Sequence, residues 1–233
     1  MNIAVLISTE IEDTGIGYYD RKIFEVLDEL NNKNQGINNI GISVGKSSSE
    51  DALREGLARN LNRGVLLVDD NYDNSNYYTV AKTLTEYLKV NNEFDIIMCG
   101  YKSHSCGTSI VPILISEYLN IPAILDVVEV TFEPGNNVIC KATHDGITEI
   151  IKSHTPCIIC CENNKAKILP TRLKSAMNAF NKEIKIERIE IQNEEYPLGN
   201  IVAEFKPRRT RKNCIYTQSE MQNFINLMVR LFK

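Results

Sequence analysis

The sequence has no apolar run approaching the roughly 20 residues that a membrane-spanning helix needs. It also lacks the basic start and long apolar region that mark a signal peptide, because its N-terminal residues pass directly into a predicted strand at 3–7. From these absences we expect a cytoplasmic protein without membrane insertion. The net charge of −4 argues against a whole-molecule attraction to nucleic acid.

Motifs of several common catalytic and metal sites are missing as well. The chain has neither the GxxxxGK[ST] sequence of phosphate-loop NTPases nor the HExxH sequence of zinc metalloproteases. Cys157, Cys160 and Cys161 form one C-x-x-C-C run, but there is no second C-x-x-C pair and the three histidines are scattered. Since a structural zinc site needs four converging ligands, we expect no metal and interpret these cysteines as buried thiols.

What is present is a regular alternation of strand and helix patterns over the first half of the chain. Apolar runs predict strands at 3–7, 40–44, 65–68 and 96–99, and apolar residues at helical spacing predict a helix after each of them. A β-α-β-α-β-α-β-α order is most simply satisfied by right-handed crossovers. We therefore predict an α/β fold with a doubly wound, mainly parallel sheet.

The pattern changes after Pro122. Short strands are predicted at 123–130, 138–142, 148–153 and 157–161, and the turn sequences EPGN and DG separate the first three of them. Such turn residues are typical of antiparallel hairpins. We therefore expect an antiparallel hairpin addition to the parallel sheet.

We predict two domains, residues 1–196 and residues 197–233, from the change of pattern near the C-terminus. In the first, residues 170–180 are predicted as a short helix or loop, and residues 182–196 are charged and irregular. The second is predicted as an extended arm followed by an amphipathic helix, with the basic cluster RRTRK at 208–212. We interpret the cluster as part of a surface arm that meets an acidic surface rather than RNA, given the negative net charge.

The stretch 94–122, FDIIMCGYKSHSCGTSIVPILISEYLNIP, joins a buried strand, a loop of small residues and a helix. Free backbone N–H groups and the positive end of the helix dipole would make this loop an anion cradle, although an ordinary turn has the same pattern. His104 and Cys106 could act as an acid, a base or a nucleophile, but no paired carboxylate or triad is recognisable around them. A polar loop residue is the simpler interpretation of His104.

Five collinear segments of the chain resemble the β subunits of electron transfer flavoproteins. Besides the stretch 94–122 they are SVGKSSSEDALREGLARNLNRGVLLV, HDGITEIIKSHTPCIICC, LPTRLKSAMNAFNKEI and a tail that carries PRR before a last helix. The resemblance implies an adenine-nucleotide-binding, Rossmann-like α/β domain and a C-terminal arm that associates with an FAD-bearing α subunit. It also implies an electron-transfer subunit, not an enzyme by itself, which serves an acyl-CoA dehydrogenase-like or other flavin dehydrogenase.

The same resemblance implies AMP or a second FAD at the strand ends of the β subunit. The residues that it assigns to this site are Leu6, Gly17, Tyr18, Tyr19, Asp20, Val44, Gly100, Tyr101, Lys102, Ser103, His104, Ser105, Cys106, Gly107 and Thr108. Leu173 matches the leucine with which the family anchors partner dehydrogenases.

Two segments depart from the family's pattern. The phosphate loop D-G-D-T-G-Q reads Ser-Cys-Gly-Thr-Ser-Ile at 105–110, and the hairpin before Tyr18 is mostly absent. Backbone N–H groups do most of the anion binding in such loops, so we still expect an adenine nucleotide. Because the missing hairpin belongs to a region that lies near the β-bound nucleotide in the family, we expect AMP rather than FAD. The alternative is a nucleotide-binding or structural relative that kept the fold but lost its redox function.

Overall fold

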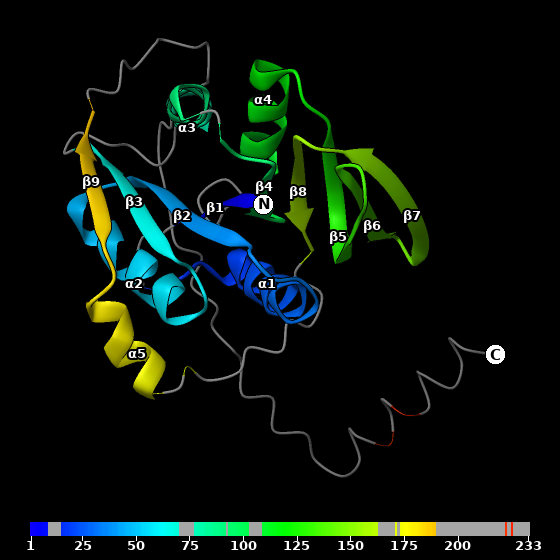
Figure 1. The fold of residues 1–233 in the computed structure, drawn as a ribbon. Helices are drawn as coiled ribbons and strands as arrows, with labels where there is room; N and C mark the ends of the chain where they lie inside the picture. The colour runs from blue at the N-terminus through cyan, green and yellow to red at the C-terminus, as the bar shows by residue number, and fades with distance from the viewer. Residues whose placement is uncertain are drawn as a thin grey trace. The chain divides into compact units, whose positions relative to one another are not determined.

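A nine-stranded sheet runs through the described residues of the computed structural model, which are 1–8, 15–69, 77–91, 93–102, 109–162, 171 and 173–189 with the single positions 222 and 225. The strands lie in the order β7-β6-β5-β8-β4-β1-β2-β3-β9 (Figure 1). Their bounds are β1 Asn2–Leu6, β2 Asn38–Gly45, β3 Arg63–Val68, β4 Ile96–Gly100, β5 Ala123–Glu133, β6 Asn137–His144, β7 Ile147–His154, β8 Cys157–Cys161 and β9 Ile184–Arg188. The helices are α1 Arg21–Lys33, α2 Glu50–Ala58, α3 Tyr77–Val90, α4 Ile110–Leu119 and α5 Leu173–Phe180, with 3₁₀ turns η1 Tyr18–Asp20 and η2 Ser47–Ser49.

The order of the central strands confirms the doubly wound, mainly parallel sheet. The chain steps outward from β1 through β2 and β3, and then returns to place β4 on the other side of β1; all three pairs are parallel. In such sheets the reversal, here between β1 and β4, leaves a crevice outside the carboxyl ends of the strands.

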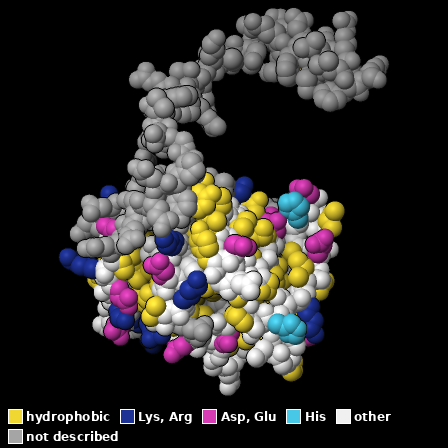
Figure 2. All heavy atoms as spheres, turned by 90° about the horizontal axis from the view of Figure 1, so that it is seen from above, with side chains coloured by type: hydrophobic (Ala, Val, Ile, Leu, Met, Phe, Trp, Pro, Cys, Tyr) yellow, Lys and Arg dark blue, Asp and Glu magenta, His cyan; other side chains and the backbone are white. Residues whose placement is uncertain are grey.

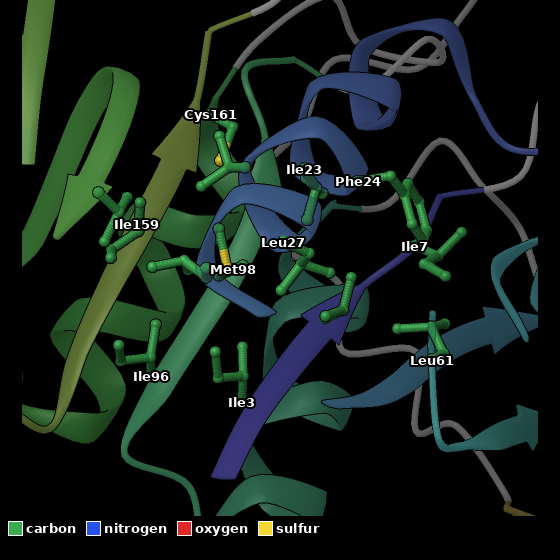
Figure 3. Packing of buried hydrophobic residues seen from close by; sticks show 14 of the residues in the cluster. Ile3, Ile7, Ile23, Phe24, Leu27, Leu61, Ile96, Met98, Ile159 and Cys161 are labelled. Atoms are coloured by element: carbon green, nitrogen blue, oxygen red, sulfur yellow. The ribbon is translucent and has the colours of Figure 1, made fainter. Parts of the chain in front are cut away.

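Helices cover both faces of the parallel part of the sheet, with α1 and α2 on one face and α3 and α4 on the other (Figure 1). Figure 3 shows Ile23 and Leu27 of α1 pointing toward Met98 of β4. Successive residues of a strand enter opposite cores, so Ile3 packs on the α1 face and Ala4 on the α3 face. This two-sided burial is the reason that the strand sequences are continuous apolar runs.

The predicted antiparallel addition is confirmed for β5, β6 and β7. β6 pairs antiparallel with both of its neighbours. At the β6–β7 turn, Asp145 and Gly146 have φ of 48° and 82°, as a type I′ hairpin turn requires. At the β5–β6 turn, Gly135 and Asn136 have φ of 81° and 59°. The Gly, Asn and Asp residues that predicted these turns therefore take the left-handed conformations that they tolerate.

The grouping of Cys157–Cys161 with the hairpin strands was wrong. This strand, β8, lies between β4 and β5 and runs parallel to both. All five of its residues are buried. A strand that is covered on both faces has no polar alternation, and the run CIICC is of this kind.

The irregular structure predicted for residues 182–196 was also wrong over part of its length. β9 pairs parallel with β3, with Ile184 opposite Gly64. It is an edge strand: Ile184 packs against the core, whereas Ile186, which lies on the same side of the strand, is 54% exposed. No residue of β9 is fully buried, so its sequence carries three charged residues and lacks the apolar run that predicted the central strands. Residues 190–196 lie outside the described residues.

The chain divides into two units, Met1–Tyr196 and Pro197–Lys233. The predicted arm and final helix belong to the second unit, of which only positions 222 and 225 are among the described residues. No helix in the described part of the first unit is long and apolar enough to cross a membrane.

Candidate functional site

The reversal of strand order between β1 and β4 is bordered by a buried carboxylate. Ser8, which follows β1, donates to Oδ2 of Asp20 from its backbone N–H at 2.7 Å and from its hydroxyl at 2.6 Å. The N–H of Gly17 donates to the Ser8 carbonyl at 3.4 Å, and the N–H of Asp20 donates to the Gly17 carbonyl at 3.0 Å. Asp20 is only 3% exposed. These bonds fasten residues 17–20 over the end of β1, so Asp20 holds backbone in place.

Gly100, the last residue of β4, lets this segment approach β4 closely. A β-carbon at Gly100 would lie 2.2 Å from Oδ1 of Asp20 and 2.6 Å from the carbonyl oxygen of Tyr19. Any other residue at position 100 would therefore displace residues 17–20. The predicted residues Asp20, Tyr19 and Gly100, far apart in the sequence, are thus brought together at one edge of the sheet.

The two described ends of the β4–α4 loop are tied to each other. The hydroxyl of Ser109 donates a hydrogen bond to the carbonyl of Tyr101, and the ammonium of Lys102 lies 4.7 Å from the centroid of the Tyr101 ring. α4 begins at the next residue after Ser109, so its free N–H groups lie near the end of β4. A helix N-terminus beside a lysine is a favourable place for an anion. The other predicted loop residues lie outside the described residues: Ser103, His104, Ser105, Cys106, Gly107 and Thr108.

Leu6 and Val44 lie at the carboxyl ends of β1 and β2, but their side chains are buried in the core on the α3 face. Only the backbone of these two residues is available to a ligand. Tyr18 is 54% exposed, and its ring packs edge-on against Tyr19 at 5.4 Å between centroids. The guanidinium of Arg21 lies 5.9 Å from the Tyr18 ring. Tyr18 is therefore the aromatic side chain of this segment that a ligand could contact.

The sequence contains one further motif that the analysis above does not name. Residues 41–45, GISVG, match the G-x-S-x-G pattern of α/β-hydrolases. In that fold the serine lies on an exposed turn, whereas Ser43 is inside β2, is 1% exposed and donates its hydroxyl to the Ile7 carbonyl at 2.9 Å. Ser43 therefore stabilises the sheet and is not a nucleophile.

The five cysteines among the described residues are buried free thiols, as expected. Cys99 and Cys160 face each other across β4 and β8 with their sulfur atoms 3.3 Å apart. The hydrogen bond with Cys160 and burial raise the pKa of Cys99, and burial raises the pKa of Cys140 to about 12 and of Cys157 to about 11. Thiols of this kind are weak nucleophiles. Among the described residues no group of three or more His, Cys, Asp or Glu could hold a metal ion.

An exposed titratable pair lies beside the β6–β7 turn. Nδ1 of His144 is 2.8 Å from Oδ2 of Asp126, and Nε2 is 3.4 Å from Asp145. The hydrogen bond with Asp126 and the charge of Asp145 raise the pKa of His144.

Over the face shown in Figure 2, basic and acidic side chains are interspersed.

A second surface feature is the outer side of α5. Leu173, Met177 and Phe180 are 78%, 63% and 76% exposed. Their i, i+4, i+7 spacing places them on one side of the helix, and we call them the α5 stripe. Only Ala179 of this helix is buried. Leu173 thus begins the helix without packing on the sheet. Sequence analysis singled out Leu173 alone, although the same spacing would have found the other two.

Comparison with known proteins gives a consistent match. The family model described as "Electron transfer flavoprotein domain" matches residues 28–190. The electron transfer flavoprotein subunit beta of Thermoanaerobacterium thermosaccharolyticum is 30% identical over 198 residues, which cover 82% of this chain and 75% of that protein. The Bacillus subtilis subunit beta is 25% identical over 199 residues, 82% of this chain and 76% of the relative.

A more specialised relative matches a shorter part. The caffeyl-CoA reductase-Etf complex subunit CarD of Acetobacterium woodii is 23% identical over 142 residues, 61% of this chain and 54% of that protein.

Proposed function

The chain belongs to the electron transfer flavoprotein family, and on this premise we propose that it works as the β subunit of a heterodimer whose α subunit carries FAD. Its role is electron transfer between a flavin dehydrogenase and a downstream acceptor, not catalysis by this chain alone. The observation that carries the proposal is the family match over residues 28–190 together with β-subunit relatives that cover most of the chain.

We place an adenine nucleotide, AMP rather than FAD, at the reversal between β1 and β4. Three described features support it: the segment 17–20 fastened by Asp20, the exposed ring of Tyr18, and Lys102 beside the N-terminus of α4. Lys102 and the free N–H groups would hold the phosphate, and Tyr18 would contact the nucleoside. The FAD of the α subunit supplies the redox chemistry when bound; this chain contributes binding and orientation.

We also propose that the α5 stripe is the docking site for an acyl-CoA dehydrogenase-like partner. Three exposed apolar side chains on one helix face make a small hot spot for a partner's apolar pocket. The exposed Lys174, next to Leu173, would attract an acidic rim around that pocket.

Co-expression with a candidate FAD-binding α subunit tests the subunit role. The heterodimer should contain FAD, and heat denaturation should release AMP in addition to the FAD of the α subunit, which chromatography separates. Replacing Gly107 by Val should lower the nucleotide content, because a bulky side chain would crowd the approach of phosphate to the loop backbone. A chain that never associates with α, or a complex without flavin, would refute the role; a complex that holds the FAD of the α subunit but neither AMP nor a second FAD would refute only the nucleotide site.

A further inference from the structure

The interactions that usually hold a helix in place are weak for α5. The helix has eight residues, and isolated helices shorter than about 12–15 residues are marginal in water. Most helices of proteins are held by an apolar face in the core, but the apolar face of α5 points outward and Ala179 alone is buried. Something other than hydrophobic packing therefore keeps α5 in place.

Two cations hold α5 and α2 together: Arg54 of α2 reaches the C-terminal end of α5, and Lys182, two residues after α5, reaches the C-terminal end of α2. Nη1 of Arg54, on α2, donates to the carbonyls of Ala179 at 3.1 Å and Lys182 at 2.8 Å. In the opposite direction, Nζ of Lys182 donates to the carbonyls of Leu57 at 2.9 Å and Leu61 at 2.6 Å. We call these hydrogen bonds of Arg54 and Lys182 the clamp. They can form only when the C-terminal ends of the two helices lie side by side.

Each side of the clamp reaches one carbonyl in the last turn of a helix, that of Ala179 in α5 and that of Leu57 in α2. The last carbonyls of a helix have no intrahelical partner, and a cation near them is favoured by the helix dipole. Arg54 is itself oriented by Glu50, one turn earlier on α2, whose Oε1 accepts hydrogen bonds from Nε at 3.2 Å and Nη2 at 2.9 Å. Burial of Lys182 lowers its pKa, because its ammonium has given up water for these carbonyls.

We propose that Arg54 and Lys182 are positioning residues for electron delivery: the clamp fixes the direction of the α5 stripe, so that a dehydrogenase meets a docking face that is already ordered. This rests on the docking role proposed above. A preformed helix loses less conformational freedom when the partner binds, so the clamp strengthens docking without touching the partner. Neither residue contributes a side chain to the stripe.

The test compares two lysine variants of the heterodimer. Lys182→Met removes the donors but keeps a long apolar side chain, and Lys185→Met makes the same change on β9, where Lys185 pairs with Glu187 at 2.6 Å. Reduction of the heterodimer is followed at increasing concentrations of butyryl-CoA dehydrogenase with butyryl-CoA. We expect Lys182→Met to raise the KM for the dehydrogenase about three- to tenfold at unchanged kcat and FAD content. Lys185→Met should change neither, and Lys182→Arg should restore most of the affinity.

A double-mutant cycle separates positioning from general destabilisation. In a heterodimer whose α5 stripe is replaced by Leu173→Ala, Met177→Ala and Phe180→Ala, adding Lys182→Met should not raise KM further, because the clamp acts only through the stripe. Equal fold-changes in both backgrounds, or an unchanged KM in Lys182→Met alone, would overturn the inference while leaving the docking role intact. An unchanged KM in the stripe variant, or no saturable reduction of the wild-type heterodimer, would overturn the docking role and the inference with it.

Discussion

Asp20 and Gly100 meet at the edge of the sheet so closely that a β-carbon on Gly100 would lie 2.2 Å from a carboxylate oxygen of Asp20. The contact joins the end of β4 to the segment that follows β1. It therefore couples the stability of the domain to the shape of the proposed nucleotide site, and both can be measured separately.

Gly100→Ala should lower the free energy of unfolding by about 1–3 kcal/mol, the usual cost of forcing extra atoms into a packed site. Part of the clash is with the Tyr19 backbone, which cannot move aside as a flexible side chain can. Urea denaturation of both proteins measures the difference. Gly64→Ala is the matched control: its nearest neighbour is a side-chain carbon of Ile184 at 3.2 Å, so the loss there should be smaller. A Gly100→Ala protein as stable as wild type would contradict the tight contact.

Asp20→Ala should cost more stability than Ser8→Ala. The first removes the acceptor of two hydrogen bonds and leaves the Ser8 N–H without its partner, at roughly 1–3 kcal/mol. The second removes only the hydroxyl bond, and we expect about 0.5–1.5 kcal/mol. Denaturant midpoints at constant m-value give the order. The reverse order would mean that Asp20 does not fasten residues 17–20.

His144 should titrate above the ordinary imidazole pKa of about 6.5, because Asp126 accepts its hydrogen bond and Asp145 lies nearby. A raised pKa in the folded state means that the stabilising charge is fully present below about pH 6.5 and is lost as the pH rises through the folded value. Proton NMR of the ring measures the midpoint, with His144→Gln to assign the signal. Asp126→Asn should move the midpoint down; asparagine is suitable because residue 126 has φ of 57°, which Asn tolerates. An unmoved midpoint would exclude the Asp126 contact as the cause.

Leu173→Ala should weaken electron transfer from an acyl-CoA dehydrogenase without lowering the melting temperature. A side chain that is 78% exposed has little to lose in folding, whereas losing about 1.4 kcal/mol of docking energy raises KM tenfold. Ile186→Ala removes a similarly exposed apolar side chain from β9 and should leave transfer unchanged. If Leu173→Ala instead lowered stability by the 2–5 kcal/mol that is usual for core leucines, with normal transfer per folded molecule, docking would be excluded.

Truncation after Tyr196 should abolish co-purification with the α subunit. The sequence predicts an extended arm and an amphipathic helix in residues 197–233, and obligate interfaces commonly bury about 2,000 Å² or more. Pull-down of a tagged α subunit with the two chain lengths compares them directly. A truncated chain that binds α as well as the full chain would show that the first unit holds the interface.

Periodicity alone determined the main fold. The apolar runs of β1 to β4 and the helical stripes between them are local patterns, so a doubly wound parallel sheet followed from them, as did the β5–β6–β7 hairpins from their Gly, Asn and Asp turns. The family resemblance came from collinear residues and likewise needed no structure. Within the site, the sequence could place residues at strand ends, because the carboxyl ends of parallel strands share one edge.

Tertiary structure alone decided which segments pair and which side chains face outward. β8 inserts beside β4, whose paired residues lie 61 positions earlier in the chain, as Ile96 does opposite Cys157, because its two-sided burial suits the interior of the sheet. β9 pairs with β3 although its own sequence is mostly charged, since none of its residues is fully buried at the edge of the sheet. The same holds for α5: Arg54 donates hydrogen bonds to carbonyls 125 and 128 positions away, and Leu173 is 78% exposed, neither of which a local pattern records. A sequence pattern records period and composition, whereas pairing and exposure depend on contacts between residues far apart along the chain.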